Sequence, residues 1–457
     1  QTSDGGYMVV GTNTESLTSN NIYDFYVVKI DAEGKVEWDR ELISPRQDFA
    51  YSVIEASDGG FVVVGEIGDA NGFNNDLLIL KLDFNGETEW EKRYGSNRYD
   101  SAFDIVETEN NEFLIVGVIG EGSRDVSKNF GREDIWLIKL DSKGSLVWQN
   151  TIGGKGSDYP NEIKATQDGG YIIAGGSSST DNGFGKNKGD TDSWIFKLDK
   201  DGNLQWQKNY GDEIKNGSSA IIQTIDGGYL LTGNSKINYL DEIKYYTVYK
   251  LDESGEIEWE IKKEENKSTE GVIETIEGNY IIAGNSKVDY WVMKLSSAGE
   301  IIYERTYGGS ERDLLKSIDN TLDGGYILAG IGNSTDGDVS ESKGSSDMWV
   351  VKIAGPPKIL QSDTSDAVFS IIMPQPVIQN NDIDMGQMIV GSTKDTIAAS
   401  VICNVGDAPL HVLGVDITDA FNSEDFLIPR GAGDFYLEKD SCQNMMFEFT
   451  PSALGNR

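Results

Sequence analysis

Three loops rich in aspartate and asparagine carry the side chains best suited to chemistry in this chain. Their carboxylate and amide oxygens are hard ligands of the kind that Ca²⁺ prefers. The candidate metal ligands are Asp69, Asn71, Asn75, Asp76, Asp181, Asp190, Asp192, Asp336 and Asp338. None of the loops has EF-hand spacing, and loops of this composition also occur without metal. Calcium binding and a plain polar loop therefore both remain as interpretations, and no cofactor is required.

Two further sets of aspartates recur along the chain. One set precedes the third strand of the repeats described below, and the other opens their first strand. The sets are Asp24, Asp76, Asp134, Asp192, Asp289 and Asp347, then Asp48, Asp100, Asp158 and Asp313. Regular recurrence favours a structural role, in which carboxylates accept backbone N–H bonds at strand starts. The alternative is an electronegative funnel for cations or a basic partner. Glycoside hydrolysis needs two unique carboxylates, and repetition hides any such pair.

Scarce residue types exclude most other chemistry. The 457 residues include one histidine, His411, and two cysteines. One histidine cannot build a His-based zinc site and argues against a Ser-His-Asp triad. The net charge is −37, from 76 acidic and 39 basic residues, which argues against nucleic acid and anionic membranes as partners. No apolar run of about 20 residues occurs, so no membrane span is expected.

A repeat must position these side chains. An Asp-Gly-Gly-aromatic turn followed by a short apolar run ending in glycine recurs at intervals of 46 to 58 residues. Its aromatic residues are Tyr7, Phe61, Phe113, Tyr171, Tyr229, Tyr280 and Tyr326. Each full unit contains four short runs of β-branched and aromatic residues bounded by Gly, Asn and Asp. Seven such units predict an all-β, seven-bladed propeller of four-stranded blades over residues 1–355.

Tryptophan and lysine occupy fixed columns of the repeat. Five tryptophans follow the Asp-x-x-Gly turn between the third and fourth strands: Trp38, Trp90, Trp148, Trp206 and Trp259. Indoles at a fixed place in every unit predict packing between blades, whereas aromatic rings of a sugar site would cluster in a few repeats. The lysine column is Lys29, Lys81, Lys139, Lys197, Lys250, Lys294 and Lys352. An aspartate two residues later on the same strand face predicts a structural ion pair, with a ligand-binding lysine ring as the alternative.

These motifs resemble known bacterial sequences. The pattern Asp-x-Trp-x-x-Lys-Leu-Asp-x-x-Gly-x-x-x-Trp, followed by Asp-Gly-Gly-Tyr, is similar to the β-propeller repeats of bacterial secreted and cell-surface proteins. Its Leu-Asp-x-x-Gly-x-x-x-Trp portion also resembles the tryptophan-docking motif of quinoprotein-like and WD40-like propellers. The resemblance covers about 350 residues and implies the fold rather than one function.

A second module follows the linker at residues 356–365. Residues 366–457 contain Ile383-Asp384-Met385-Gly386 and Asn404-Val405-Gly406-Asp407. They resemble the abnormal-spindle/hydin (choice-of-anchor D) type of Ig-like β-sandwich. Cys403 and Cys442 lie on predicted strands of this module, which leaves two interpretations: a disulfide across the sandwich, as suits an extracellular protein, or two buried thiols.

Both ends of the chain interrupt their units, so we expect it to be a fragment. The first unit lacks its first strand and the seventh lacks its fourth strand, and propellers usually close by pairing such strands in one blade. The second module also stops before a last strand.

Binding residues usually lie on variable loops. The predicted function is therefore non-enzymatic binding and adhesion, outside the cell or at the cell surface. The propeller is expected to be monomeric. The partner is a protein or carbohydrate, with the Ig-like module as spacer or anchor. The alternative is a propeller enzyme, either a carbohydrate-active hydrolase or lyase or a quinoprotein-like oxidoreductase.

Overall fold

A computed structural model describes two compact units, Gln1–Ala354 and Gly355–Arg457. In the first unit the described residues are 1–14, 23–42, 47–68, 75–95, 98–121, 125, 129–184, 187–236, 245–339 and 346–354. In the second they are 355, 395–404, 410–413, 426–430, 434–437 and 441–449. All elements in these ranges are strands, and none contains a helix long and apolar enough to cross a membrane.

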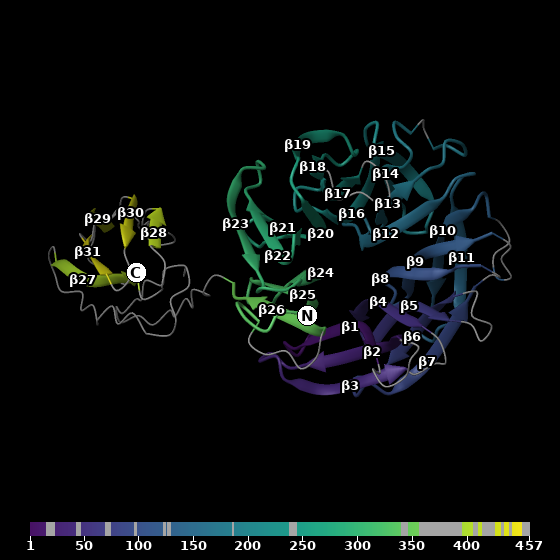
Figure 1. Cartoon of the computed structure of the whole chain (residues 1–457), viewed down its shortest axis with the longest axis horizontal. Coiled ribbons are helices and arrows are strands. Elements are labelled where there is room, and N and C mark those ends of the chain that lie inside the picture. Colours follow the sequence, from purple (N-terminus) through teal and green to yellow (C-terminus); the bar gives the residue numbers. More distant parts are fainter. Residues whose placement is uncertain are drawn as a thin grey trace, which may run out of the picture. The chain divides into compact units, whose positions relative to one another are not determined.

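The first unit is a seven-bladed β-propeller, as the repeats predict (Figure 1). Every blade is an antiparallel sheet whose strands follow chain order. Blade 1 has three strands: β1 (Tyr7–Thr14), β2 (Tyr23–Ile30) and β3 (Val36–Leu42). Blade 2 has β4 (Asp48–Glu55), β5 (Phe61–Gly68), β6 (Asn75–Leu82) and β7 (Thr88–Tyr94). Blade 3 has β8 (Ser101–Glu107), β9 (Phe113–Gly120), β10 (Glu133–Leu140) and β11 (Leu146–Ile152).

The remaining blades repeat this plan. Blade 4 has β12 (Asp158–Ala165), β13 (Tyr171–Ser177), β14 (Asp192–Leu198) and β15 (Leu204–Tyr210). Blade 5 has β16 (Lys215–Gln223), β17 (Tyr229–Lys236), β18 (Tyr245–Leu251) and β19 (Ile257–Lys263). Blade 6 has β20 (Lys267–Glu274), β21 (Tyr280–Ser286), β22 (Asp289–Leu295) and β23 (Ile301–Tyr307). Blade 7 has β24 (Leu314–Asn320), β25 (Tyr326–Gly332) and β26 (Asp347–Ile353).

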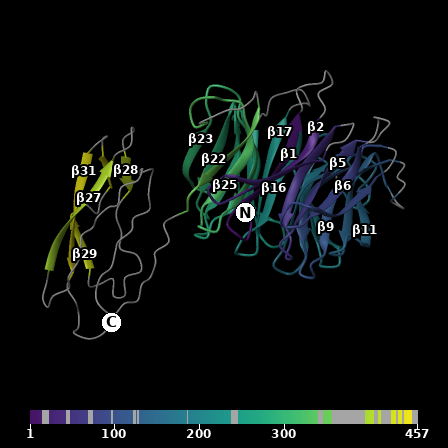
Figure 2. The same ribbon diagram turned by 90° about the horizontal axis from the view of Figure 1, so that it is seen from below.

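The first strand of each complete blade is its innermost strand. The strands β4, β8, β12, β16, β20 and β24 contact one another in succession around the centre, while β3, β7, β11, β15, β19 and β23 lie at the rim (Figure 1). Because consecutive strands are antiparallel, the Asp-Gly-Gly and Asp-x-x-Gly turns share one face of the disc, here called the turn face. The other connections form the opposite face, here called the loop face. Figure 2 shows the disc from its side.

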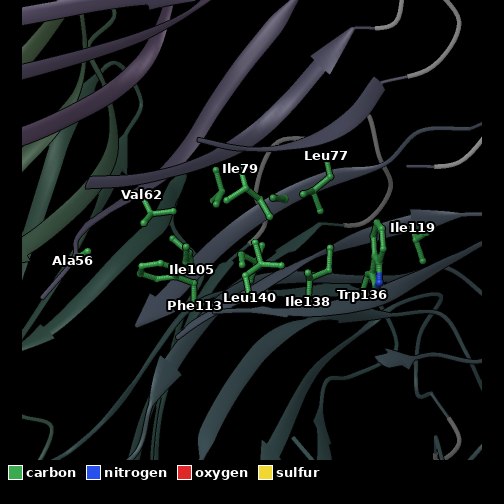
Figure 3. Packing of buried hydrophobic residues seen from close by; sticks show 13 residues of the cluster. Ala56, Val62, Leu77, Ile79, Ile105, Phe113, Ile119, Trp136, Ile138 and Leu140 are labelled. Atoms are coloured by element: carbon green, nitrogen blue, oxygen red, sulfur yellow. The ribbon is translucent and has the colours of Figure 1, made fainter. Parts of the chain in front are cut away.

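Apolar side chains fill the wedges between blades. Between blades 2 and 3, Val62, Leu77 and Ile79 pack against Ile105, Phe113, Trp136 and Ile138, all at least nine-tenths buried (Figure 3). Blades 1 and 7 also meet, because Tyr7 and Ile30 cluster with Ile327 and the N-terminal amine lies 2.8 Å from Asp319 Oδ2. The ring of blades is therefore continuous.

The tryptophan column joins each blade to the next. Trp38, Trp90, Trp148, Trp206 and Trp259 each lie against the glycine of the turn between the third and fourth strands of the following blade, where an added Cβ would have its nearest indole atom at 2.5–3.1 Å. The Trp38 Nε1–H donates to the Phe84 carbonyl of that turn at 3.2 Å. Trp38 and Trp90 also contact the aromatic residue after the next Asp-Gly-Gly turn, with ring centroids 5.9 and 6.2 Å apart. We call each of these contacts a blade lock.

In the second unit the described strands form two small antiparallel sheets. They are β27 (Asp395–Asn404), β31 (Ser441–Phe449) and β29 (Phe426–Arg430) in one sheet, and β28 (Leu410–Leu413) and β30 (Asp434–Leu437) in the other. The Ig-like sandwich remains a prediction. Cys403 is the direct partner of Cys442 in the β27–β31 register, so the two cysteines lie on adjacent strands of one sheet instead of across a sandwich.

The blade lock predicts a difference between two turn glycines of nearly identical conformation. Gly202 has φ 82° and lies against Trp148, whereas Gly34 has φ 83° and has no atom within 4 Å of an added Cβ. Gly34→Ala should cost only the left-handed strain, about 1 kcal/mol. Gly202→Ala should cost about 1–3 kcal/mol more, because it also displaces the indole. Urea unfolding of both variants measures the difference, and equal losses would show that the lock adds no stability.

The register also supports a disulfide, which we propose between Cys403 and Cys442. Directly opposed residues of an antiparallel pair have Cα atoms about 4.5–5.5 Å apart, within the range that a disulfide requires. Peptide mapping without reductant should therefore recover the two cysteines in one linked peptide. Quantitative alkylation of both thiols in protein purified under oxidising conditions would contradict the pairing.

Candidate functional site

Each complete first strand carries a β-bulge at the same place. The strand pairing skips one residue between Ala50 and Ser52 of β4, and the same shift occurs in β8, β12, β16, β20 and β24. The skipped residues are Tyr51, Phe103, Asn161, Ser219, Glu270 and Lys316. We call these six residues the bulge ring. Bulges often re-aim a side chain beside a functional site.

The repeated glycine of the second strand exists to accommodate this bulge. An added Cβ at Gly65 would overlap the carbonyl oxygen of Phe49, and Gly117 and Gly284 face Ser101 and Ser268 in the same way. Only glycine lets the two backbones approach this closely. The glycine that ends each apolar run was thus the sequence signal of the bulge, although sequence reasoning did not use it.

The bulge ring lines the central channel in the half nearer the loop face. None of its six side chains is buried, whereas the residue before each bulge is buried, for example Ala102 before Phe103 and Leu315 before Lys316. These residues lie on the innermost strands, so an exposed side chain there faces the channel. The ring combines two aromatic residues, an amide, a hydroxyl, an acid and a base, and is therefore the point where the repeat stops being uniform.

Four aromatic rings form a row along one side of the channel mouth. Tyr23 lies 5.7 Å from Phe49 with planes 27° apart, and Phe49 lies 6.3 Å from Tyr51 at 11°. Tyr51 in turn lies 5.7 Å from Phe103 of the next blade at 14°. We call this row, which spans blades 1 to 3, the aromatic ladder. Sequence reasoning missed it because its members come from one third strand and two first strands.

A buried carboxylate lies beside the ladder. Glu66 is the direct partner of Phe49 in the β4–β5 register, and its side chain is 3% exposed. Its Oε1 accepts a hydrogen bond from Asn75 Nδ2 at 2.9 Å, and the Tyr51 and Tyr99 phenols hydrogen-bond to the same carboxylate. Burial and the charge of Glu66 raise the pKa of both the Tyr51 and Tyr99 phenols. Both phenols therefore remain neutral hydrogen-bond donors at physiological pH.

The opposite side of the ring is polar. Ser219 Oγ accepts a hydrogen bond from Asn234 Nδ2 at 2.7 Å, and Glu270 Oε1 accepts one from Asn285 Nδ2 at 3.1 Å. Asn161 Nδ2 donates to the Ser218 carbonyl of the following blade. Lys316 completes this side as an exposed cation. The channel mouth therefore has an aromatic arc on one side and a polar arc on the other.

The predicted metal ligands are not gathered at this mouth. Asp69 and Asn71 lie outside the described residues, and Asp190 is exposed. Asn75 binds Glu66, and the Asp76 carboxylate lies against Gly95. Asp181 and Asp336 accept the N–H groups of Lys155 and Ser310, and Asp338 accepts that of Gly308. Within the described ranges no group of three or more His, Cys, Asp or Glu side chains is arranged to hold a metal ion.

The strand-opening aspartates fasten loops of the loop face. The buried Asp158 accepts the Gly154 N–H and the Ser179 hydroxyl, both at 2.8 Å. The buried Asp313 makes the same pair of bonds with Gly309 at 3.0 Å and Ser334 at 2.7 Å. Asp48 and Asp100 accept the N–H groups of Gly68 and Gly120 at 2.9 Å. These bonds are those expected of a structural column.

One aspartate of the other column is less well compensated. Asp134 is 0% exposed, and its Oδ1 has no partner within the described ranges, while its Oδ2 accepts the Phe130 N–H. Burial raises the pKa of Asp134 to about 6, and the charge of Asp158 adds to the rise. A carboxyl group with this pKa resembles a general acid, but it is sealed from solvent and has no route to a substrate.

Every lysine of the column forms an ion pair, but with a different acid from the predicted one. Lys29, Lys81, Lys197, Lys250 and Lys352 pair with the aspartate of the Asp-Gly-Gly turn at 2.8–3.0 Å. Lys139 and Lys294 pair with Glu112 and Glu277 at 2.7 and 3.1 Å. The aspartate two residues later instead closes its own turn: Asp31 Oδ1 accepts the N–H groups of Glu33 and Lys35.

No family model and no curated protein sequence matches the chain. Among solved structures, it is similar to virginiamycin B lyase from Staphylococcus aureus, with a TM-score of 0.43 and 13% identity over 71% of this chain and 95% of that chain. It is also similar to the WD40 domain of Neurospora crassa Pan2, with a TM-score of 0.44 and 12% identity over 67% and 82%. Kuenenia stuttgartiensis hydrazine synthase gives a TM-score of 0.45 and 11% identity over 73% and 92%.

The raised pKa of Asp134 predicts a pH-dependent stability change. Because the folded-state pKa lies above that of the unfolded chain, the favourable contribution of the protonated group is lost as pH rises from about 4 to about 6. Asp134→Asn should therefore raise the free energy of unfolding at pH 7.5 by about 1–3 kcal/mol, and the gain should vanish towards pH 4. Urea unfolding at both pH values measures it.

The control is the aspartate at the same position of blade 4. Asp192 Oδ2 accepts the Lys188 N–H at 2.9 Å and Asn209 Nδ2 at 3.0 Å, and its Oδ1 accepts the Gly189 N–H at 3.3 Å. Asp192→Asn should therefore gain no stability at either pH. A gain at pH 4 equal to that at pH 7.5 for Asp134→Asn would disprove the titration argument.

Proposed function

We propose that the protein is a non-enzymatic scaffold that binds an extracellular protein or carbohydrate at the channel mouth of its loop face. The observation that carries this proposal is the chemistry of the bulge ring. The positions that pack blades together repeat the same residue types. The bulge ring instead has a different kind of side chain in nearly every blade, and only two of its members share a type, being aromatic: Tyr51, Phe103, Asn161, Ser219, Glu270 and Lys316. Diverse side chains held on a rigid scaffold are typical of a recognition surface.

The carboxylates support binding over catalysis. Hydrolysis needs two accessible carboxyl groups flanking a substrate bond, with pKa values set apart by their surroundings. The Asp134 and Asp158 pair is buried beneath the loops, and a corresponding pair, Asp289 and Asp313, recurs between blades 6 and 7 with the pKa of Asp289 raised by burial and by Asp313. Recurrence at blade junctions favours a structural role for these pairs.

The other parts of the chain have supporting roles in this proposal. The second unit acts as an Ig-like spacer or anchor at the cell surface, and the propeller is monomeric. The acidic loops around Asp181 and Asp336 order the loop face, with Ca²⁺ as an optional ligand through the oxygens that do not bind backbone. The net charge of −37 favours neutral or basic partners over acidic ones.

The binding role is tested with two lysine variants of equal charge change. Lys316→Ala removes the cation of the bulge ring, and Lys200→Ala removes a lysine on the turn face that is 74% exposed. Glycan and protein arrays probed with the full chain, with and without calcium, should show ligands whose signal changes at least severalfold for Lys316→Ala and not for Lys200→Ala.

A turnover screen run on the same compounds supplies the opposing outcome. Reproducible turnover that a single carboxylate substitution abolishes would replace the scaffold with an enzyme. Equal effects of the two lysine variants would place the binding surface away from the channel mouth.

A further inference from the structure

We infer that the aromatic ladder, together with Glu66 and Tyr99, is a subsite for a neutral saccharide chain. The inference rests on the proposed function and names the ligand class for one arc of the channel mouth. It starts from the placement of the aromatic residues. The tryptophans of the blade locks occur in blades 1 to 5, at the same place in each outer strand, but the ladder occurs in blades 1 to 3 alone among the described blades.

The rings form a platform and not a cage. Consecutive planes differ by only 11–27°, and the centroids are 5.7–6.3 Å apart. Parallel rings stacked directly face to face would have centroids about 3.5–4 Å apart. These rings are therefore displaced sideways relative to one another, and each leaves part of its face uncovered by its neighbour. Tyr51 accordingly keeps 43% of its surface exposed. A row of flat apolar faces matches the C–H faces of successive pyranose rings.

Hydrogen-bonding groups lie at the edge of the platform. Glu66 is a buried carboxylate to which the Tyr51 and Tyr99 phenols hydrogen-bond, and these two residues are 43% and 41% exposed. A buried carboxylate that orients two part-exposed phenols presents fixed hydrogen-bonding groups at the edge of an open site. Hydroxyl groups of a saccharide can exchange hydrogen bonds with the two phenols, and Glu66 beneath them positions this network.

Charge selects a neutral saccharide. The bulge ring and Glu66 together carry two acids, Glu66 and Glu270, against one base, Lys316, and this excess of negative charge opposes uronic, sialic or sulfated sugars. A basic peptide would also be attracted, but a cation is held best by rings that enclose it, and the rings of the ladder form a row of nearly parallel planes. The amide and hydroxyl groups of Asn161 and Ser219 across the mouth also suit a polyhydroxylated ligand.

The test is calorimetric titration of the full chain with short neutral oligosaccharides of glucose, mannose, galactose or N-acetylglucosamine, beside a panel of basic peptides. Tyr51→Ala and Phe103→Ala should each weaken saccharide binding about tenfold or more. Tyr51→Phe keeps the platform and should weaken it only about threefold. Glu66→Gln should weaken binding severalfold, because the amide loses the negative charge that orients the two phenols.

The matched control is Phe84→Ala, which removes a ring that is 69% exposed on the turn face and should leave binding unchanged. Saccharide binding that survives Tyr51→Ala and Phe103→Ala would overturn the ladder as the subsite. Binding of basic peptides alone, weakened by the same variants, would overturn the saccharide assignment and leave the proposed function intact. A chain that binds neither panel, with protein arrays also negative, would overturn both.

Discussion

The contact between a tryptophan and a turn glycine of the next blade is the constraint on which this propeller depends. Each indole fills the space that a side chain would occupy on the Asp-x-x-Gly turn, and the same glycine must also adopt positive φ. The lock therefore sets the distance between the outer strands of neighbouring blades. With the outer edges held, the apolar faces of the sheets pack as wedges and the first strands meet around the channel. The geometry of the channel mouth follows from contacts made at the rim.

The acidic composition also serves the joints between blades. Glu55, Glu107 and Glu274 end a first strand, and each accepts the N–H of the Asp-Gly-Gly turn in the preceding blade, at Ser3, Ser57 and Ile225. Behind each turn, a lysine on the third strand binds the turn acid. A carboxylate that accepts a backbone N–H needs no cation as a partner. Each additional repeat therefore adds more acidic than basic residues. The net charge of −37 thus contains a structural component that comes from the joints between blades.

The regular features could be predicted from the sequence and the bulge could not. Strand number, turn positions and the packing role of tryptophan followed from residues that recur at a fixed place. The lysine partner was wrong because the same-face rule within one strand chose Asp31 for Lys29, whereas the fold brings Asp4 from the turn that precedes β1. The bulge ring was missed because residues such as Tyr51, Asn161 and Lys316 share no chemistry. Glu66 was missed because its burial depends on neighbours from separate strands.

The bulge explains why diversity is concentrated at one position. A residue of the first strand that is paired with the second strand must fit against the next blade, so its substitution disturbs the packing between blades. The skipped residue opposes no partner on the second strand, and its side chain points to solvent in the channel. Changing it therefore costs little stability, while the glycine opposite keeps the backbone in place. The packing between blades can then stay the same in every repeat while the residues of the bulge ring vary. The same separation explains why the ladder and Glu66, which depart from the repeat, are the residues to test first for binding.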